Sequence, residues 1–94
     1  MIHLDSTVTH MDSSEALDRQ LTAEVRDAMQ AAGVSQRELA AKTGIPMVTL
    51  NRRLTGHGKG FTVSELITAG NALGLSLVEL AIRAERSLAR SAAA

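Results

Sequence analysis

The sequence predicts an all-α protein, built as one compact domain of five helices. Apolar residues recur along most of the chain at three- and four-residue spacing, which is the period of one helix face. Strand signals are nearly missing, because the chain has a single aromatic residue and few β-branched runs. A chain of 94 residues has room for one hydrophobic core of a few helices.

The first helix is expected over residues 13–32. Its apolar positions run from Leu17 to Ala32, and Gly33 is placed to end it. Residues 1–11 contain only a brief apolar alternation and are expected to form a flexible tail. The domain is then expected to cover residues 12–89, with a short C-terminal tail at 90–94.

Three later helices are marked at their starts by a capping box. In this motif a Ser or Thr caps the third helical amide while a Glu at that position reaches back to the capping residue. Glycines, and Pro46 in a first turn, supply the remaining boundaries. The boxes are Ser35–Glu38, Thr62–Glu65 and Ser76–Glu79, and the expected helices are 36–43, 46–55, 63–73 and 77–89.

The second and third helices are joined by the short segment Lys42–Pro46. Gly44 can adopt the left-handed conformation that lets two short helices cross steeply, and Ala40 lies where a larger side chain would clash. This geometry predicts a helix-turn-helix. Its apolar anchors to the core are expected to be Leu39, Ile45, Leu50 and Leu54.

The stretch from Ser35 to Gly56, SQRELAAKTGIPMVTLNRRLTG, closely resembles the Xre and lambdoid phage repressor family of Cro/C1-type helix-turn-helix proteins. Residues 61–80 are similar to the family's fourth helix and the start of its fifth. The resemblance covers residues 15–86 in all. It implies a lambda-repressor-like DNA-binding domain whose helix-turn-helix is formed by the second and third helices.

In this family the third helix enters the major groove, and its exposed positions meet base edges. Asn can pair with adenine and Arg with guanine through two hydrogen bonds, whereas Met and Val offer apolar contact to a thymine methyl. The alternative is that Met47 and Val48 belong to the core, where apolar side chains usually lie. The base-reading residues that the resemblance implies are Met47, Val48, Asn51, Arg52 and Thr55.

A second set of residues is expected to contact phosphates. Gln36 resembles the family position that grips a phosphate, and a helix N-terminus favours an anion there. Arg53 departs from the family pattern, which has an apolar residue at this position; its stem is expected to pack on the core while the guanidinium reaches solvent or a phosphate. The set comprises Gln36, Arg37, Arg53, His57 and Lys59.

The charge of the chain is unevenly distributed. Ten basic and ten acidic residues give a formal net charge of zero, which counts against a nucleic-acid partner. Residues 1–33, however, hold six acidic and two basic residues, whereas residues 34–60 hold five basic residues against Glu38 alone. The basic stretch coincides with the expected helix-turn-helix.

Other kinds of function are disfavoured. The chain has no cysteine and its three histidines are scattered, so no metal site, disulfide or cofactor is expected. No paired carboxylates or nucleophile with a base are evident, which predicts a protein that is not an enzyme and has no small-molecule substrate. Its longest apolar runs are far short of a membrane helix, and a secretory leader pattern is missing, so a cytoplasmic protein without a membrane partner is expected.

These inferences predict a sequence-specific, double-stranded DNA-binding transcriptional regulator that represses by promoter occlusion, as a phage immunity repressor or a Cro-like protein does. The fifth helix carries apolar residues such as Val78 and Ile82 beyond what the core needs, so a homodimer on DNA is expected. Two alternatives stay open: an antitoxin that represses its own operon, and a module that uses the same helices to bind another protein.

Overall fold

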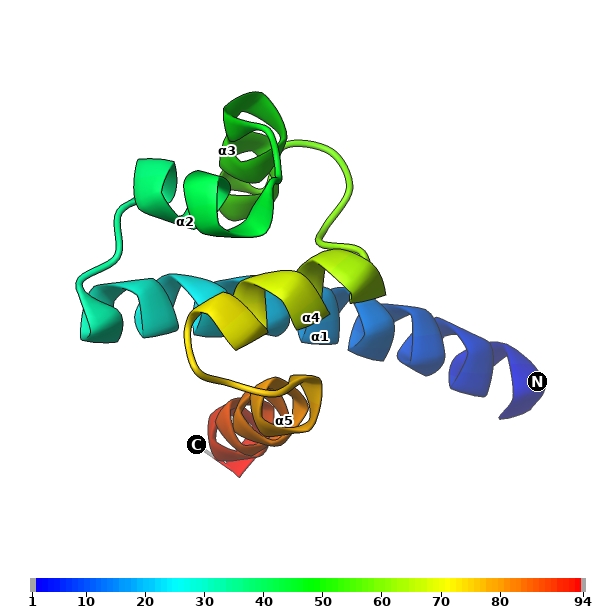
Figure 1. Cartoon of the computed structure of the whole chain (residues 1–94). Coiled ribbons are helices and arrows are strands. Elements are labelled where there is room, and N and C mark those ends of the chain that lie inside the picture. The colour runs from blue at the N-terminus through cyan, green and yellow to red at the C-terminus, as the bar shows by residue number, and fades with distance from the viewer. Residues whose placement is uncertain (1, 94) are drawn as a thin grey trace.

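The computed structural model describes the backbone of residues 2–93 and the side chains of residues 15–93. Within this range the chain is all-helical, as predicted, and contains five helices and no strand. The helices are α1 (Ile2–Ala32), α2 (Gln36–Thr43), α3 (Met47–Thr55), α4 (Val63–Ala72) and α5 (Leu77–Ala93) (Figure 1).

The helices are arranged around α1, which runs the length of the molecule. In Figure 1, α2 and α3 lie on one side of α1 and α4, and α5 lies on the opposite side. α1 packs against α5 and α3, while α4 packs against α2 and α5. The helix-turn-helix is therefore presented on the side of the domain that faces away from α5.

The core lies between these helices and draws on all of them. Its largest fully buried side chains are Val25 of α1, Leu39 of α2, Leu50 of α3 and Leu80 of α5. Burial of such side chains stabilises the folded state by about 1.5–3 kcal/mol each. Leu66 and Ala69 bring α4 into the same cluster.

The three predicted capping boxes are all formed. Each Ser or Thr hydroxyl accepts a hydrogen bond from the Glu amide three residues on, at 3.1 Å, and each Glu carboxylate accepts one from the capping residue's amide, at 2.9–3.0 Å. Each box satisfies two amides that have no partner within the helix. α2, α4 and α5 therefore begin at the residues that the sequence predicts.

The outer bounds of the two end helices need correction. α1 begins at Ile2 instead of residue 13, and α5 continues to Ala93 instead of ending at 89. Residues 1–32 and 77–94 contain neither Gly nor Pro, so nothing in the local sequence ends either helix where its amphipathic pattern stops. The division into a domain and two tails stays a prediction.

Gly70, in the last turn of α4, allows the close approach of the turn that leads into α5. A Cβ at this position would lie 2.6 Å from the Leu75 carbonyl oxygen and 3.0 Å from Cδ1 of Leu80. The Leu75 amide also donates to the Gly70 carbonyl at 2.8 Å. At position 70, therefore, only the hydrogen atom of a glycine side chain fits between α4 and this turn.

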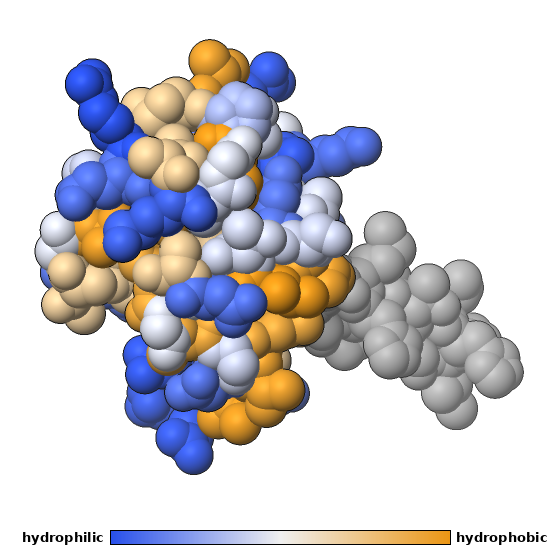
Figure 2. Space-filling view, in the orientation of Figure 1, coloured by the Kyte–Doolittle hydropathy of each residue, from blue (hydrophilic) through white to orange (hydrophobic). Residues whose placement is uncertain are grey.

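Large apolar side chains are exposed in two places among the described residues. Met47 and Val48 lie on α3, and the others lie on α4 and α5. Figure 2 shows apolar surface gathered over α4 and α5. The exposed members on these two helices are Val63, Ile67, Val78 and Ile82.

No single helix in the described part of the chain is long and apolar enough to cross a membrane. α4 and α5 together reach that length and composition, but the chain bends by 100° between them.

Candidate nucleic-acid interface

The turn between α2 and α3 is fixed by short-range hydrogen bonds. Gly44 has φ of 77°, in the left-handed region that glycine adopts most readily, and its amide donates to the Ala40 carbonyl at 2.9 Å. The Thr43 hydroxyl donates to the Leu39 carbonyl at 2.8 Å and accepts from the Ile45 amide at 3.1 Å. The angle between the two helices is therefore set by the turn itself.

α3 has one buried face and one exposed face. Leu50 and Leu54 are buried, which confirms them as core anchors together with Leu39 and Ile45. Met47 is 43% exposed and Val48 is 71% exposed, so the alternative that places them in the core is wrong. The exposed face consists of Met47, Val48, Asn51, Arg52 and Thr55.

Gln36 and Asn51 meet where α2 and α3 cross. The Asn51 side-chain amide donates to Oε1 of Gln36 at 3.5 Å. Gln36 is the first residue of α2, where backbone amides point out of the helix and favour an anion. The structure therefore brings a predicted phosphate contact and a predicted base reader side by side.

The end of α3 leads directly to His57. The Thr55 hydroxyl donates to the Asn51 carbonyl at 2.8 Å, and its oxygen lies 3.1 Å from Nδ1 of His57. The Thr55 hydroxyl proton is thus used within the helix, while the oxygen can accept a hydrogen bond from His57. His57 is exposed, immediately beyond the exposed face of α3.

Arg53 differs from its expected arrangement. Its guanidinium turns toward α4, where Nε lies 2.8 Å from Oε1 of Glu65 and Nη2 lies 3.4 Å from Oε2. Nη1 donates to the Lys59 carbonyl at 3.3 Å. The side chain of Arg53 is only 19% exposed, so its guanidinium reaches a carboxylate of the same domain and not open solvent.

Glu65 is a residue that the sequence analysis assigned only to a helix cap. The hydrogen bond from Arg53 is the main reason that the pKa of Glu65 lies below its usual value, and the Thr62 amide adds to the effect. The same contact raises the pKa of Arg53. The only local sign of this ion pair in the sequence is the charged residue at position 53. That residue alone does not reveal a partner twelve residues further along the chain.

A basic cleft lies beside the exposed face of α3. It has a volume of about 340 Å³, and Arg52, His57 and Lys59 are among its lining residues. Nη2 of Arg52 lies 3.8 Å from the place that a Cβ of Gly58 would take, so Arg52 borders the loop. Among the described side chains, no three His, Asp or Glu residues converge as a metal site would require.

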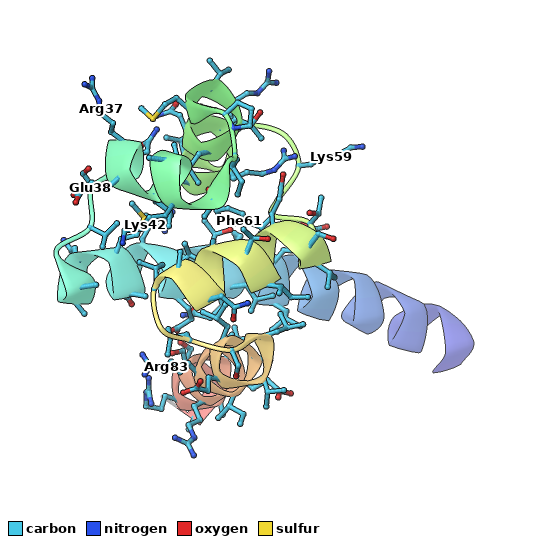
Figure 3. The ribbon with its side chains drawn as sticks, in the orientation of Figure 1. Arg37, Glu38, Lys42, Lys59, Phe61 and Arg83 are labelled. Atoms are coloured by element: carbon cyan, nitrogen blue, oxygen red, sulfur yellow. The ribbon has the colours of Figure 1, made fainter. Side chains whose placement is uncertain are left out.

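Arg37 and Lys59 lie at opposite ends of the layer formed by α2 and α3. Both side chains extend away from the body of the domain in Figure 3. Glu38, the one acidic residue of the basic stretch, has a pKa below its usual value because the backbone amide and the hydroxyl of Ser35 both hydrogen-bond to it. Basic side chains therefore flank the exposed face of α3 on two sides.

Comparison with known proteins agrees with this arrangement. The family model described as Helix-turn-helix matches residues 25–80, which include α2, α3 and α4 in full. The chain has no match among the curated proteins or the solved structures. The chain belongs to the Cro/C1-type helix-turn-helix family of DNA-binding regulators, as its resemblance to the Xre and lambdoid repressors predicted.

Proposed function

We propose that this protein is a sequence-specific transcriptional regulator that binds a double-stranded DNA operator and represses by occluding a promoter. The observation that carries the proposal is the exposed face of α3. The opposite face of this helix is anchored in the core by Leu50 and Leu54. A helix held in this way presents its side chains in fixed positions, and the major groove of B-DNA is wide enough to admit it.

The base-reading residues differ in the chemistry that they bring. Asn51 can bond to N6 and N7 of adenine, and Arg52 can bond to O6 and N7 of guanine. Met47 and Val48 supply apolar contact with thymine methyl groups, and Thr55 lies at the far end of the face. Specificity then depends on a few polar readers together with thymine methyls.

Phosphate contacts are assigned to residues that border this face. Gln36 uses the N-terminus of α2, and Arg37 extends from the next position. His57 and Lys59 line the cleft beyond the other end of α3. Because the net charge of the chain is zero, these few contacts must supply most of the electrostatic affinity, and binding should weaken steeply as salt increases.

A second copy of the chain is the proposed occupant of the apolar surface on α4 and α5. This surface includes Ile67 and Ile82, which are 40% and 42% exposed. Its α5 part lies on the side of the domain opposite α2 and α3, so two copies joined there leave both recognition faces free (Figure 1). Homodimers with two-fold symmetry bind inverted repeats whose half-sites lie about one DNA turn apart.

Selection of bound duplexes from a random pool tests the function. We expect one recovered sequence motif with two inverted halves, and an affinity for it that falls steeply between low and physiological salt. Recovery of no enriched motif, at any salt concentration that leaves the protein folded, would contradict sequence-specific binding. Reporter repression from a promoter that overlaps the motif would then separate a repressor from a regulator that merely binds.

A protein-binding module is the second candidate, because Met47 and Val48 are exposed apolar side chains and the chain carries no net charge. In that case the face of α3 would contact another protein, as an antitoxin could contact a toxin. The two candidates separate on the salt series: a module of this kind would be retained on no duplex. The chemistry of Asn51 and Arg52, with basic residues around them, favours DNA.

A further inference from the structure

The loop between α3 and α4, residues 56–62, is tied to the domain by the Arg53–Glu65 ion pair and, at its end, by Phe61, which packs against the core. Arg53, on α3, reaches the Lys59 carbonyl with Nη1 and the Glu65 carboxylate with Nε and Nη2. Through these three contacts Arg53 holds the middle of the loop and the start of α4 at once.

Glu65 completes the link at the end of the loop. Its Oε1, which receives Nε of Arg53 at 2.8 Å, also accepts a hydrogen bond from the Thr62 amide at 2.9 Å. The Thr62 hydroxyl accepts in turn from the Glu65 amide at 3.1 Å. One carboxylate therefore serves both the capping box of α4 and the anchor of the loop to α3.

This loop would be mobile without such contacts. Three of its seven residues are glycines, which have the largest backbone freedom to lose on ordering. Within the loop, the only backbone amides that donate to a backbone carbonyl are those of Gly56 and His57, and both bonds return to the end of α3. Beyond His57 the loop is held by side chains: Phe61 packs against the core at its end, Arg53 holds the Lys59 carbonyl, and Glu65 holds the Thr62 amide.

We infer that the Arg53–Glu65 ion pair positions the α3–α4 loop so that His57 and Lys59 meet the DNA backbone, and that Arg53 is not itself a phosphate contact. This inference rests on the proposed function. It makes Arg53 and Glu65 positioning residues, since both act through the loop. It also explains why a charged residue stands at a position of α3 where the side chain is only 19% exposed.

Loss of the Glu65 charge should change DNA affinity in the direction opposite to that expected from simple electrostatics. Removing a negative charge close to bound DNA ordinarily strengthens binding, because DNA is a polyanion. If Arg53 contacted a phosphate directly, removing Glu65 would also release its guanidinium for that contact. A positioning ion pair instead requires that loss of the Glu65 charge weakens binding.

The decisive variant is Glu65→Gln, measured on the duplex recovered by selection. Gln is accepted in a capping box, so α4 keeps its N-terminal cap. We expect affinity to fall about two- to tenfold, the range that loss of one hydrogen bond's net free energy gives, and the salt slope to fall by about 1. The matched control is Glu79→Gln, which makes the same change in the capping box of α5, where Arg83 is near but forms no hydrogen bond or close ion pair with the carboxylate. Equal or tighter binding by Glu65→Gln would overturn the inference.

A second measurement needs no DNA. In the free protein we expect the backbone order parameters of His57–Phe61 to drop toward the flexible range, below about 0.6, in Glu65→Gln but not in Glu79→Gln. Unchanged order parameters would overturn the positioning role, even where DNA binding weakened. If the unmodified chain bound no duplex, the proposed function and the phosphate role would both fail, while this measurement would still decide whether the ion pair orders the loop.

Discussion

The side-chain amide of Asn51 donates to Oε1 of Gln36 across the crossing of α2 and α3. The donor lies on the exposed face of α3, and the acceptor lies at the N-terminus of α2. The proposed base reader and the proposed phosphate contact thus touch each other before any DNA arrives. A contact of this kind lowers the entropy that the two side chains lose on binding.

The first prediction concerns this pair. Asn51→Ala should relax the preference at one base pair and cost about 1–3 kcal/mol on the selected site. Gln36→Ala should weaken binding to all sequences alike, since a phosphate carries no sequence information. Because the two side chains touch, the cost in the double variant should differ from the sum of the single costs by at least 0.5 kcal/mol, as is usual for residues in contact. Strict additivity in a binding titration would mean that the hydrogen bond has no role in recognition.

The second prediction separates Arg52 from Lys59. Arg52→Ala should cost about 1–3 kcal/mol and relax the preference at one base pair. Lys59→Ala should weaken binding uniformly and lower the salt slope by about 1. Competition titrations with single-base variants of the site measure both effects. Uniform weakening by Arg52→Ala would reassign Arg52 to the phosphate contacts.

The third prediction tests the close approach at Gly70. Replacing a helical glycine by alanine normally stabilises a helix by up to about 1 kcal/mol. Here the added methyl group would lie 2.6 Å from a backbone oxygen, so Gly70→Ala should lower the free energy of unfolding by about 1–3 kcal/mol. Urea unfolding measures the change. Asn71→Ala, at the adjacent exposed position of α4, is the control and should change stability by less than about 0.5 kcal/mol.

The fourth prediction concerns acid stability. The pKa values of Glu38, Glu65 and Glu79 all lie below the usual value, chiefly through capping-box hydrogen bonds and, for Glu65, through Arg53. Because the folded state prefers the ionised form, each contributes stability above the unfolded pKa of about 4.3 and loses it as pH falls through the lower folded value. Urea midpoints should therefore be level near neutrality and decline below about pH 4.5. Glu65→Gln should flatten that decline, and an unchanged profile would show that the ion pair adds no stability.

Much of the fold was predictable because its signals are local. A capping box needs four consecutive residues, and the turn at Gly44 needs one glycine and its neighbours, so the starts of α2, α4 and α5 could be found from sequence. The extension of α1 to Ile2 was missed because an amphipathic pattern can end before a helix does. A helix can continue past its amphipathic pattern until a residue such as Gly or Pro ends it.

The candidate site likewise combines features that follow from the local sequence with one that depends on tertiary packing. The exposed face of α3 follows from helical spacing, once Leu50 and Leu54 are assigned to the core. The ion pair of Arg53 could not be predicted, because its partner Glu65 comes within reach only when α3 and α4 pack. Local chemistry predicts candidate contact residues, whereas the ion pair between α3 and α4 is visible only in the tertiary structure.

The last prediction concerns the apolar surface on α4 and α5. Ile82→Glu places a charge on this surface, where a second copy of the chain is proposed to bind, so the molar mass in light scattering should fall to that of a single chain. Binding to the full inverted repeat should then weaken far more than binding to an isolated half-site, because two linked copies gain from binding both halves together. Ser91→Glu adds the same charge to an exposed position on the same helix and should leave both quantities close to those of the unmodified protein. If Ile82→Glu kept the mass of the unmodified protein and its preference for the full repeat, the contact between copies would have to lie elsewhere on the domain.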